Sequence, residues 1–187
     1  MRDEITPPAL TDRRSQKTRT ALLAAFFALL PERGYDALQV GDICARANSG
    51  RSTFYEHFRS KADLLCASIK APFGHLVDML EPDAARRPVI DLLHHFRQQQ
   101  QLTRVLLAGP TRTLLSQTLT SLIAARLHGD DAGTPSGPAQ IAARMIAEAQ
   151  LALIELWILG RPACTVDAAA DALGRSSSAL AGTLEKT

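Results

Sequence analysis

Two short helices joined by a tight turn are predicted between residues 40 and 58, VGDICARANSGRSTFYEHF. Apolar residues recur every three or four positions on each side of the turn, as expected for one face of a helix: Val40, Ile43 and Ala47 before it, Phe54 and Phe58 after it. Between them lies Asn48-Ser49-Gly50, and Asn and Gly adopt positive φ more readily than other residues. This helix pair and its sharp reversal constrain how the rest of the chain can fold.

The exposed side of the second helix carries side chains that suit nucleic-acid recognition. They are Arg51, Ser52, Thr53, Tyr55, Glu56 and His57. Compact hydrogen-bond donors and an aromatic hydroxyl near a helix N-terminus can bind base edges and phosphates in a major groove. The apolar spacing alone would also fit a helix pair in any helical protein.

Residues 15 to 66 resemble the DNA-binding domain of the TetR family of transcriptional regulators. The family pattern is approximately a Gly-Tyr pair, a second helix that starts with Thr-Val, an Ala-Gly-Val-Ser turn, Thr-Phe-Tyr-x-His-Phe, and a Lys that begins the next helix. The matching residues are Gly34, Tyr35, Val40, Ile43, Ala47, Thr53, Phe54, Tyr55, His57, Phe58 and Lys61. Residues and spacings agree together, which makes the resemblance specific.

The resemblance and the positions on the second helix indicate the DNA-binding residues. We expect Arg51 and Thr53 to contribute to base recognition, and Tyr55, His57 and Lys61 to bind phosphates. Ser52 and Arg46 complete the expected set. Arg13, Arg14, Lys17 and Arg19 belong to a basic N-terminal segment that either reaches the DNA or is only a solvated tail.

Three departures from the family pattern affect this region. Gln39 stands where the family usually has Thr, so the helix that follows lacks its usual side-chain cap, at a cost of roughly 1 kcal/mol. Gly41 weakens the helix start further, and Asp42 compensates in part through the helix dipole. Asn48 and Gly50 replace Gly and Ser or Thr in the turn, and Gly50 offers no hydroxyl to a phosphate.

Composition and charge favour a DNA-binding segment joined to a second helical domain. Of 187 residues, 46% are hydrophobic, which is enough for a sizeable core. The net charge is only +2, with ten Lys and Arg against seven Asp and Glu up to Ala62. The three widely separated cysteines show no disulfide or metal spacing, so we expect a cytoplasmic protein without a metal or other cofactor. No stretch is apolar enough for a membrane span.

Helical periodicity continues to the C-terminus and no segment alternates with period two, so we expect an all-α fold of about nine helices. A flexible basic arm over residues 1–14, a helix-turn-helix domain over 15–62 and a ligand-binding and dimerisation domain over 63–187 are predicted. Besides the pair at 40–58, helices are expected over residues 15–33, 60–81, 88–98, 101–107, 111–128, 138–159 and from 165 onward. Pro72 should either divide the second of these or act as a hinge. Gly109-Pro110 should separate two others.

The last two helices combine apolar and small side chains on one face, which favours a four-helix bundle between two subunits. Ordinary packing within one chain is the alternative. The family resemblance favours the dimer, because a DNA site with two-fold symmetry requires two DNA-binding domains. The expected interface residues are Leu153, Leu156, Val166, Ala169, Ala170, Leu173 and Leu180.

The resemblance also implies a small-molecule pocket in the second domain. The candidate lining residues are Phe73, His94, His95, Gln98, Arg104 and Trp157, although core filling is the default for the aromatic ones. His94 and His95 are adjacent on a helix and point in different directions, so one should face the core and the other solvent. Without a glycine-rich phosphate loop or a nucleophile elbow, no catalytic residue is predicted.

The sequence therefore predicts a homodimeric DNA-binding regulator that is not an enzyme. The expected partners are palindromic double-stranded operator DNA, a second copy of the chain and a small apolar or amphipathic effector that releases a repressor from the DNA. A regulator that activates, a regulator without an effector, and a helical-bundle enzyme with an incidental helix-turn-helix are the alternatives.

Overall fold

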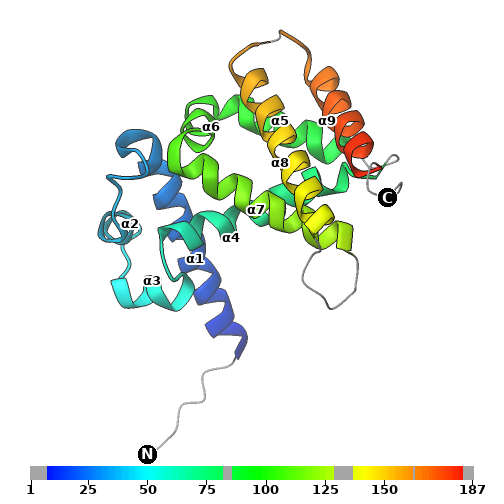
Figure 1. Cartoon of the computed structure of the whole chain (residues 1–187). Coiled ribbons are helices and arrows are strands. Elements are labelled where there is room, and N and C mark those ends of the chain that lie inside the picture. Colours follow the sequence, from blue (N-terminus) through cyan, green and yellow to red (C-terminus); the bar gives the residue numbers. More distant parts are fainter. Residues whose placement is uncertain (1–7, 82–85, 129–136, 162, 183–187) are drawn as a thin grey trace, which may run out of the picture. The chain divides into compact units, whose positions relative to one another are not determined.

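The computed structural model describes residues 8–81, 86–128, 137–161 and 163–182, and within these ranges the chain forms helices and no strands. The helices are α1 (Pro8–Arg33), α2 (Val40–Arg46), α3 (Arg51–His57), α4 (Lys61–Asp78), α5 (Arg86–Gln98), α6 (Gln100–Leu106), α7 (Gly109–His128), α8 (Gly137–Ile158) and α9 (Val166–Ala181) (Figure 1). The predicted all-α class is confirmed. None of the described helices is both long and apolar enough to cross a membrane.

The chain divides into two compact units, residues 1–65 and 66–187, and the division falls within α4. The predicted assignment of DNA binding to residues 15–62 and of effector binding and dimerisation to 63–187 stays a prediction.

The core of the first unit is formed by large apolar side chains of its helices. Those that are fully or nearly fully buried are Leu22, Phe26 and Leu30 of α1, Leu38, Ile43 of α2, Phe54 of α3, Phe58, and Leu64 and Leu65 of α4. The rings of Phe54 and Phe58 lie 5.8 Å apart, so the predicted apolar face of the second motif helix points into this core. Each such side chain contributes roughly 1.5–3 kcal/mol by leaving water.

The structure corrects three expectations about helix boundaries. Helix α1 begins at Pro8, so residues 8–14 are helical and only residues 1–7 of the predicted arm lie outside the described residues. Helix α4 runs through Pro72 without division. The chain breaks between α6 and α7 as predicted, but Gly109 and Pro110 already belong to α7, which was expected to begin at Thr111. Gly109 has a φ of +53°, and Pro110 lies in the first turn, where its missing N–H costs no hydrogen bond.

Helix α8 forms the centre of the second unit and packs against both α7 and α9. Buried apolar residues extend along its length: Ala142, Ala143, Ile146, Ala147, Leu151, Ile154, Trp157 and Ile158. Gln150 is also fully buried, and its Nε2 atom donates to the Leu76 carbonyl at 2.9 Å and to Ser177 Oγ at 2.8 Å. One amide thus connects α4, α8 and α9.

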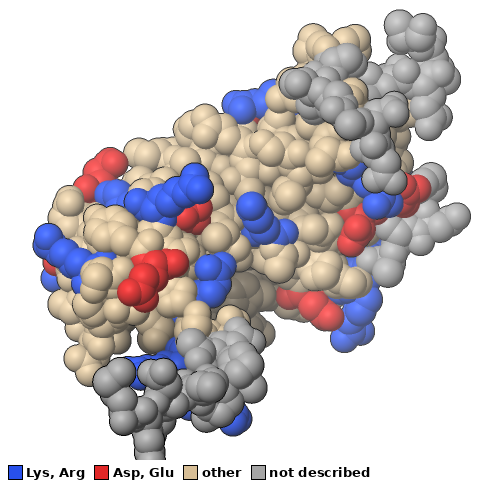
Figure 2. All heavy atoms as spheres, turned by 90° about the horizontal axis from the view of Figure 1, so that it is seen from below, with Lys and Arg blue, Asp and Glu red and all other residues tan. Residues whose placement is uncertain are grey.

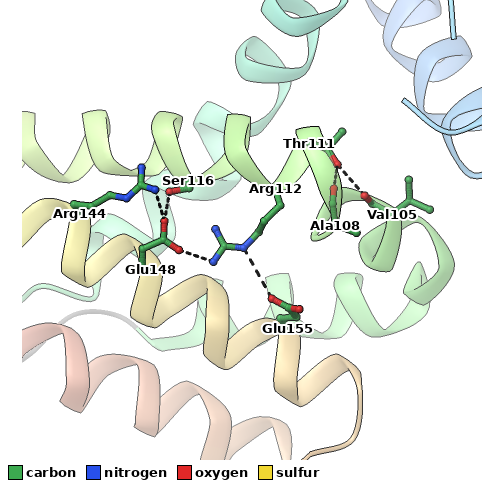
Figure 3. A network of polar contacts seen from close by, with 8 residues as sticks. All are labelled: Val105, Ala108, Thr111, Arg112, Ser116, Arg144, Glu148 and Glu155. Carbon is green, nitrogen blue, oxygen red and sulfur yellow. Dashed lines mark hydrogen bonds and ion pairs between the residues drawn. The ribbon is translucent and has the colours of Figure 1, made fainter. Parts of the chain in front are cut away.

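A polar network joins α7 to α8 (Figure 3). The carboxylate of Glu148 accepts from Ser116 Oγ at 2.6 Å and from Arg112 Nη2 at 2.6 Å. Arg144 also pairs with Glu148, at 2.8 Å. The hydrogen bond from Ser116, followed by the contacts with the two arginines, lowers the pKa of Glu148 despite partial desolvation. The network therefore fixes α8 against α7 through a carboxylate that remains charged at neutral pH.

Candidate nucleic-acid interface

The turn between α2 and α3 is shaped mainly by Asn48. Asn48 has a φ of +50°, the conformation expected for the reversal. Gly50 does not share it: its φ is −76°, and it is the extended residue that precedes α3. A Cβ at Gly50 would meet Ser52 Oγ at 3.6 Å, an ordinary contact, so the backbone here would also accept the Ser or Thr of the family pattern. The expectation that both residues supply positive φ is correct only for Asn48.

Asp42 caps the start of α2 that Gln39 leaves without a side-chain cap. Its carboxylate accepts from the Gln39 backbone N–H at 2.9 Å and pairs with Arg33 at 2.7 Å. The hydrogen bond from Gln39 is the largest cause of the lowered pKa of Asp42, and Arg33 adds to it. The compensation predicted from the helix dipole is thus a direct contact, and it orients α2 relative to the end of α1.

A groove of about 580 Å³ runs between the N-terminal part of α1 and the exposed face of α3. We call it the α1–α3 groove. Its lining residues are Arg14, Ser15 and Thr18 of α1, Asn48, Ser49 and Gly50 of the turn, and Thr53, Glu56 and His57 of α3. Most of these side chains are hydrogen-bond donors, as recognition of bases and phosphates requires. Two residues predicted to bind DNA, Thr53 and His57, lie in it.

Other predicted DNA-binding residues are exposed but do not line the groove. Ser52 and Arg46 are exposed, and Tyr55 is 58% exposed although its ring packs edge-on against Phe54. Arg51 is exposed and its guanidinium lies over Gly41, where an added Cβ would be only 2.7 Å from Arg51 Nη2. The glycine that weakens the α2 helix start therefore leaves space for the Arg51 side chain.

Lys61 has a different environment from the one expected of a phosphate ligand. Its Nζ atom donates to the backbone carbonyls of Tyr35 at 2.6 Å and Leu38 at 2.9 Å, with Asp36 at 3.4 Å. The same ammonium lies 4.4 Å from the centroid of the Tyr35 ring. An ammonium has three donors, so these carbonyls use its capacity. In this structure Lys61 fixes the connection between α1 and α2, and its expected role at a phosphate is not supported by its contacts.

Seven residues of the α1–α3 groove were outside the predicted DNA-binding set, and three of them, Asn48, Ser49 and Gly50, were assigned to the turn. Glu56 was recognised only as exposed, and Arg14 only as part of the basic segment. Ser15 and Thr18 belong to the first turns of a helix predicted to start later than it does. Arg19, expected with Arg14 in the basic segment, instead lies over the Phe58 ring at 4.7 Å. A helical-wheel projection of α1 from Pro8 would have grouped Arg14, Ser15 and Thr18.

Charge is distributed in small groups on the face shown in Figure 2. Lys and Arg side chains alternate there with Asp and Glu side chains instead of forming one continuous basic patch. On this face, recognition would therefore depend on individual side chains more than on a broad positive potential.

The predicted effector-binding residues are not brought together. Phe73 and Trp157 are buried in the second unit, whereas His94, His95, Gln98 and Arg104 are exposed. The expectation that one histidine of the pair faces the core is wrong. Trp157 is held as a core residue: its Nε1 atom donates to the Cys164 carbonyl at 3.3 Å, and the Arg97 guanidinium lies 4.2 Å from its ring.

The predicted dimer residues divide into buried and exposed groups. Val166, Ala169, Ala170 and Leu173 of α9 are buried within the chain, because α9 packs against α5 and α8. Ordinary packing within the chain, the alternative to a subunit interface, accounts for their burial. Leu153 and Leu180 are half-buried. Leu156 is exposed, and it belongs to a different set of exposed apolar residues: Ile141, Met145 and Leu156 of α8, and Leu159, which directly follows this helix.

Comparison with known proteins agrees with this arrangement. Residues 22–67 match the family model of bacterial regulatory proteins, tetR family. The uncharacterized HTH-type transcriptional regulator YxbF of Bacillus subtilis (strain 168) is 37% identical over 70 residues, which are 37% of this chain but only 18% of that protein. The matched part thus spans less than a fifth of YxbF.

Two solved structures extend the similarity over most of the chain. A TetR transcriptional regulator from Streptococcus agalactiae 2603V has 26% identity and a TM-score of 0.57, covering 91% of this chain and 99% of the other. A TetR-family regulator (SCO0857) from Streptomyces coelicolor A3 has the same fold, with a TM-score of 0.64, 18% identity and coverage of 89% and 96%. These similarities show a DNA-binding domain of the tetR family over residues 22–67, within a chain that shares its helical fold with solved TetR-family regulators.

Proposed function

We propose that the protein is a homodimeric repressor that binds a palindromic operator through the α1–α3 groove and leaves it when a small effector binds. The observation that carries DNA binding is the groove itself. It combines exposed donors from two helices and a turn, and the predicted residues Thr53 and His57 lie in it. Ser52 and Tyr55 extend the same exposed helix face outside the groove.

The proposed palindromic operator has two half-sites, and each chain offers one such recognition surface. Binding both half-sites therefore requires a dimer. The exposed apolar residues Ile141, Met145, Leu156 and Leu159 replace the buried α9 residues as the proposed interface. The first three lie on one face of α8 and Leu159 directly follows the helix. An uncovered apolar surface of this kind is characteristic of an association surface.

The proposed effector site is a groove of about 540 Å³ formed by residues that directly follow α4, the start of α5 and α9. Met79, Ala170 and Gly174 give it an apolar lining. Arg86 and Arg175 add positive charge, and Glu81 and Asp171 add negative charge. Arg86 already pairs with Asp171 at 2.8 Å, which leaves Arg175 as the cation better placed to bind an anion. This volume and polarity suit a small amphipathic molecule with an anionic group.

Binding to DNA selected from a random pool tests the proposed function. We expect the wild-type protein to enrich an inverted-repeat sequence and to retard the promoter nearest its own gene in a gel shift with excess nonspecific competitor. Thr53→Ala should weaken the enriched site while the fold, measured by far-UV circular dichroism, is retained. No enriched sequence would contradict the proposed function.

Repression and effector release need a separate experiment. In a reporter controlled by the enriched site, the protein should lower expression, and a rise in expression would indicate an activator. Medium-chain carboxylic acids are the effector probes, and they should weaken DNA binding by the wild-type protein but much less by Arg175→Gln. Arg161→Gln is the control, since Arg161 is also exposed but does not line the groove.

A further inference from the structure

Among the described residues that line the α1–α3 groove, Glu56 is the only acidic one. The other lining side chains are neutral or basic, and the groove is the proposed DNA-binding surface. Within the described part of the chain the Glu56 carboxylate has no hydrogen bond or ion pair, and it is exposed. Asp42 differs in this respect, because it is held by Arg33 and the Gln39 backbone. Glu56 therefore presents an unpaired charge on the surface that would approach DNA.

The position of Glu56 on α3 places it among the residues expected to reach the bases. Thr53 and Glu56 are three residues apart and Ser52 and Glu56 four apart, so these side chains are neighbours on the helix surface. Thr53 lines the same groove. A helix whose exposed face enters the major groove brings such neighbouring side chains to base edges in the same half-site.

Electrostatics restricts what an unpaired carboxylate can contact on DNA. Next to a phosphate it repels, and opposite guanine or thymine it meets base acceptors. Cytosine presents its N4 amino group as a donor in the major groove, without the neighbouring N7 acceptor that adenine has. The contact that removes the repulsion and satisfies the carboxylate is thus a hydrogen bond from cytosine N4.

We propose that Glu56 is a specificity-determining residue whose carboxylate accepts a hydrogen bond from the N4 amino group of a cytosine in each operator half-site. This inference rests on the proposed DNA-binding function and extends it by naming one base and the side chain that selects it. The same charge lowers affinity for DNA that lacks the cytosine, because the carboxylate is then left near phosphates or base acceptors without a donor.

The test compares the wild type with Glu56→Gln, Glu56→Ala and Glu32→Gln in selection from a random DNA pool, followed by competition binding. Glu32→Gln is the matched control. It removes the same charge from an exposed position on α1 that lies about 27 Å along the helix from Arg14, outside the groove. Far-UV circular dichroism verifies that each variant is folded.

We expect the wild type and Glu32→Gln to require cytosine at one position of each half-site. Glu56→Ala should lose roughly tenfold to a hundredfold of this discrimination, and Glu56→Gln should shift toward adenine, whose N6 and N7 atoms match an amide. Both Glu56 variants should bind nonspecific DNA more tightly. If both retain the wild-type base preference at every position, the inference is wrong even though the DNA-binding proposal stands. If the wild type itself selects no sequence, the proposed function fails.

Discussion

The ammonium group of Lys61 is held by backbone carbonyls of the segment that joins α1 to α2, and it lies over the Tyr35 ring. Replacing it in Lys61→Met leaves these carbonyls without their charged donor. We expect the free energy of unfolding to fall by about 1–3 kcal/mol, measured by urea denaturation. Lys70→Met is the control, because Lys70 is exposed on the same helix, and it should change stability little.

The salt dependence of DNA binding separates this role from a phosphate contact. A lost phosphate contact lowers the slope of log K against log salt by about one. We expect Lys61→Met to leave the slope unchanged while weakening affinity through the displaced helices. Unchanged stability together with a slope lowered by about one would restore the original assignment of Lys61 to a phosphate.

Residue roles that depend on local backbone conformation were predictable from the sequence, whereas those that depend on contacts between elements were not. Gly34 has the left-handed φ of +74° expected at the end of α1, and Thr165 caps α9 by accepting from the Ala168 N–H at 3.1 Å. By contrast, Arg51 packs over Gly41, and Lys61 donates to the Tyr35 carbonyl. Each of these contacts joins separate elements. No spacing within one helix indicates them.

At the scale of elements, the contact between α7 and α8 depends on the charged form of Glu148. Glu148→Gln keeps the shape but weakens the bonds with Ser116, Arg112 and Arg144. Because Glu148 is partly exposed, solvent screening reduces the effect, and we expect a loss of roughly 1–2 kcal/mol in the free energy of unfolding. Arg144→Gln, which removes only the exposed pair within α8, should cost much less. Equal losses in the two variants would contradict a central role for Glu148.

The pH dependence of unfolding provides an independent test of the same network. The pKa of Glu148 is lowered in the folded protein, so its contribution is complete above the ordinary glutamate pKa of about 4.3 and is lost as pH falls through the lower folded value. Thermal unfolding from pH 7 to pH 3 should therefore show a smaller acid-induced decrease in Glu148→Gln than in the wild type. Identical decreases would exclude the linkage.

Helix existence was predictable from apolar periodicity, but the partner of each apolar face was not. The stripe containing Ala169 and Leu173 was correctly identified as buried on α9, yet α5 and α8 of the same chain cover it. A periodic pattern indicates that a face avoids water without indicating which surface covers it. The same reason explains why the exposure of both His94 and His95 was not predicted. Val89, Leu92 and Leu93 form the buried face of α5, and neither histidine lies on it.

At the scale of the whole molecule, the exposed apolar residues of α8 and of the position after it form the proposed association surface. Ile141, Met145, Leu156 and Leu159 are 63%, 54%, 48% and 48% exposed. Their spacing places them within one side of the helix, and Ala152 between them is exposed and small enough for close approach of a second helix. A two-fold contact would bury the same four side chains on both subunits and remove them from water.

Single charges placed on the two faces distinguish this interface from the interior. Met145→Glu or Leu156→Glu would bury an unpaired carboxylate in the dimer, at a cost of several kcal/mol, while each chain stays folded. Leu173→Glu should instead unfold the second unit, because Leu173 is fully buried within the chain. Ala168→Glu, at an exposed position of α9, is the control and should leave both assembly and folding intact.

Sedimentation equilibrium at micromolar concentration, with circular dichroism on the same samples, should give folded monomers for Met145→Glu and Leu156→Glu and a folded dimer for the control. A dimer that survives both Met145→Glu and Leu156→Glu would place the interface on another surface of the second unit.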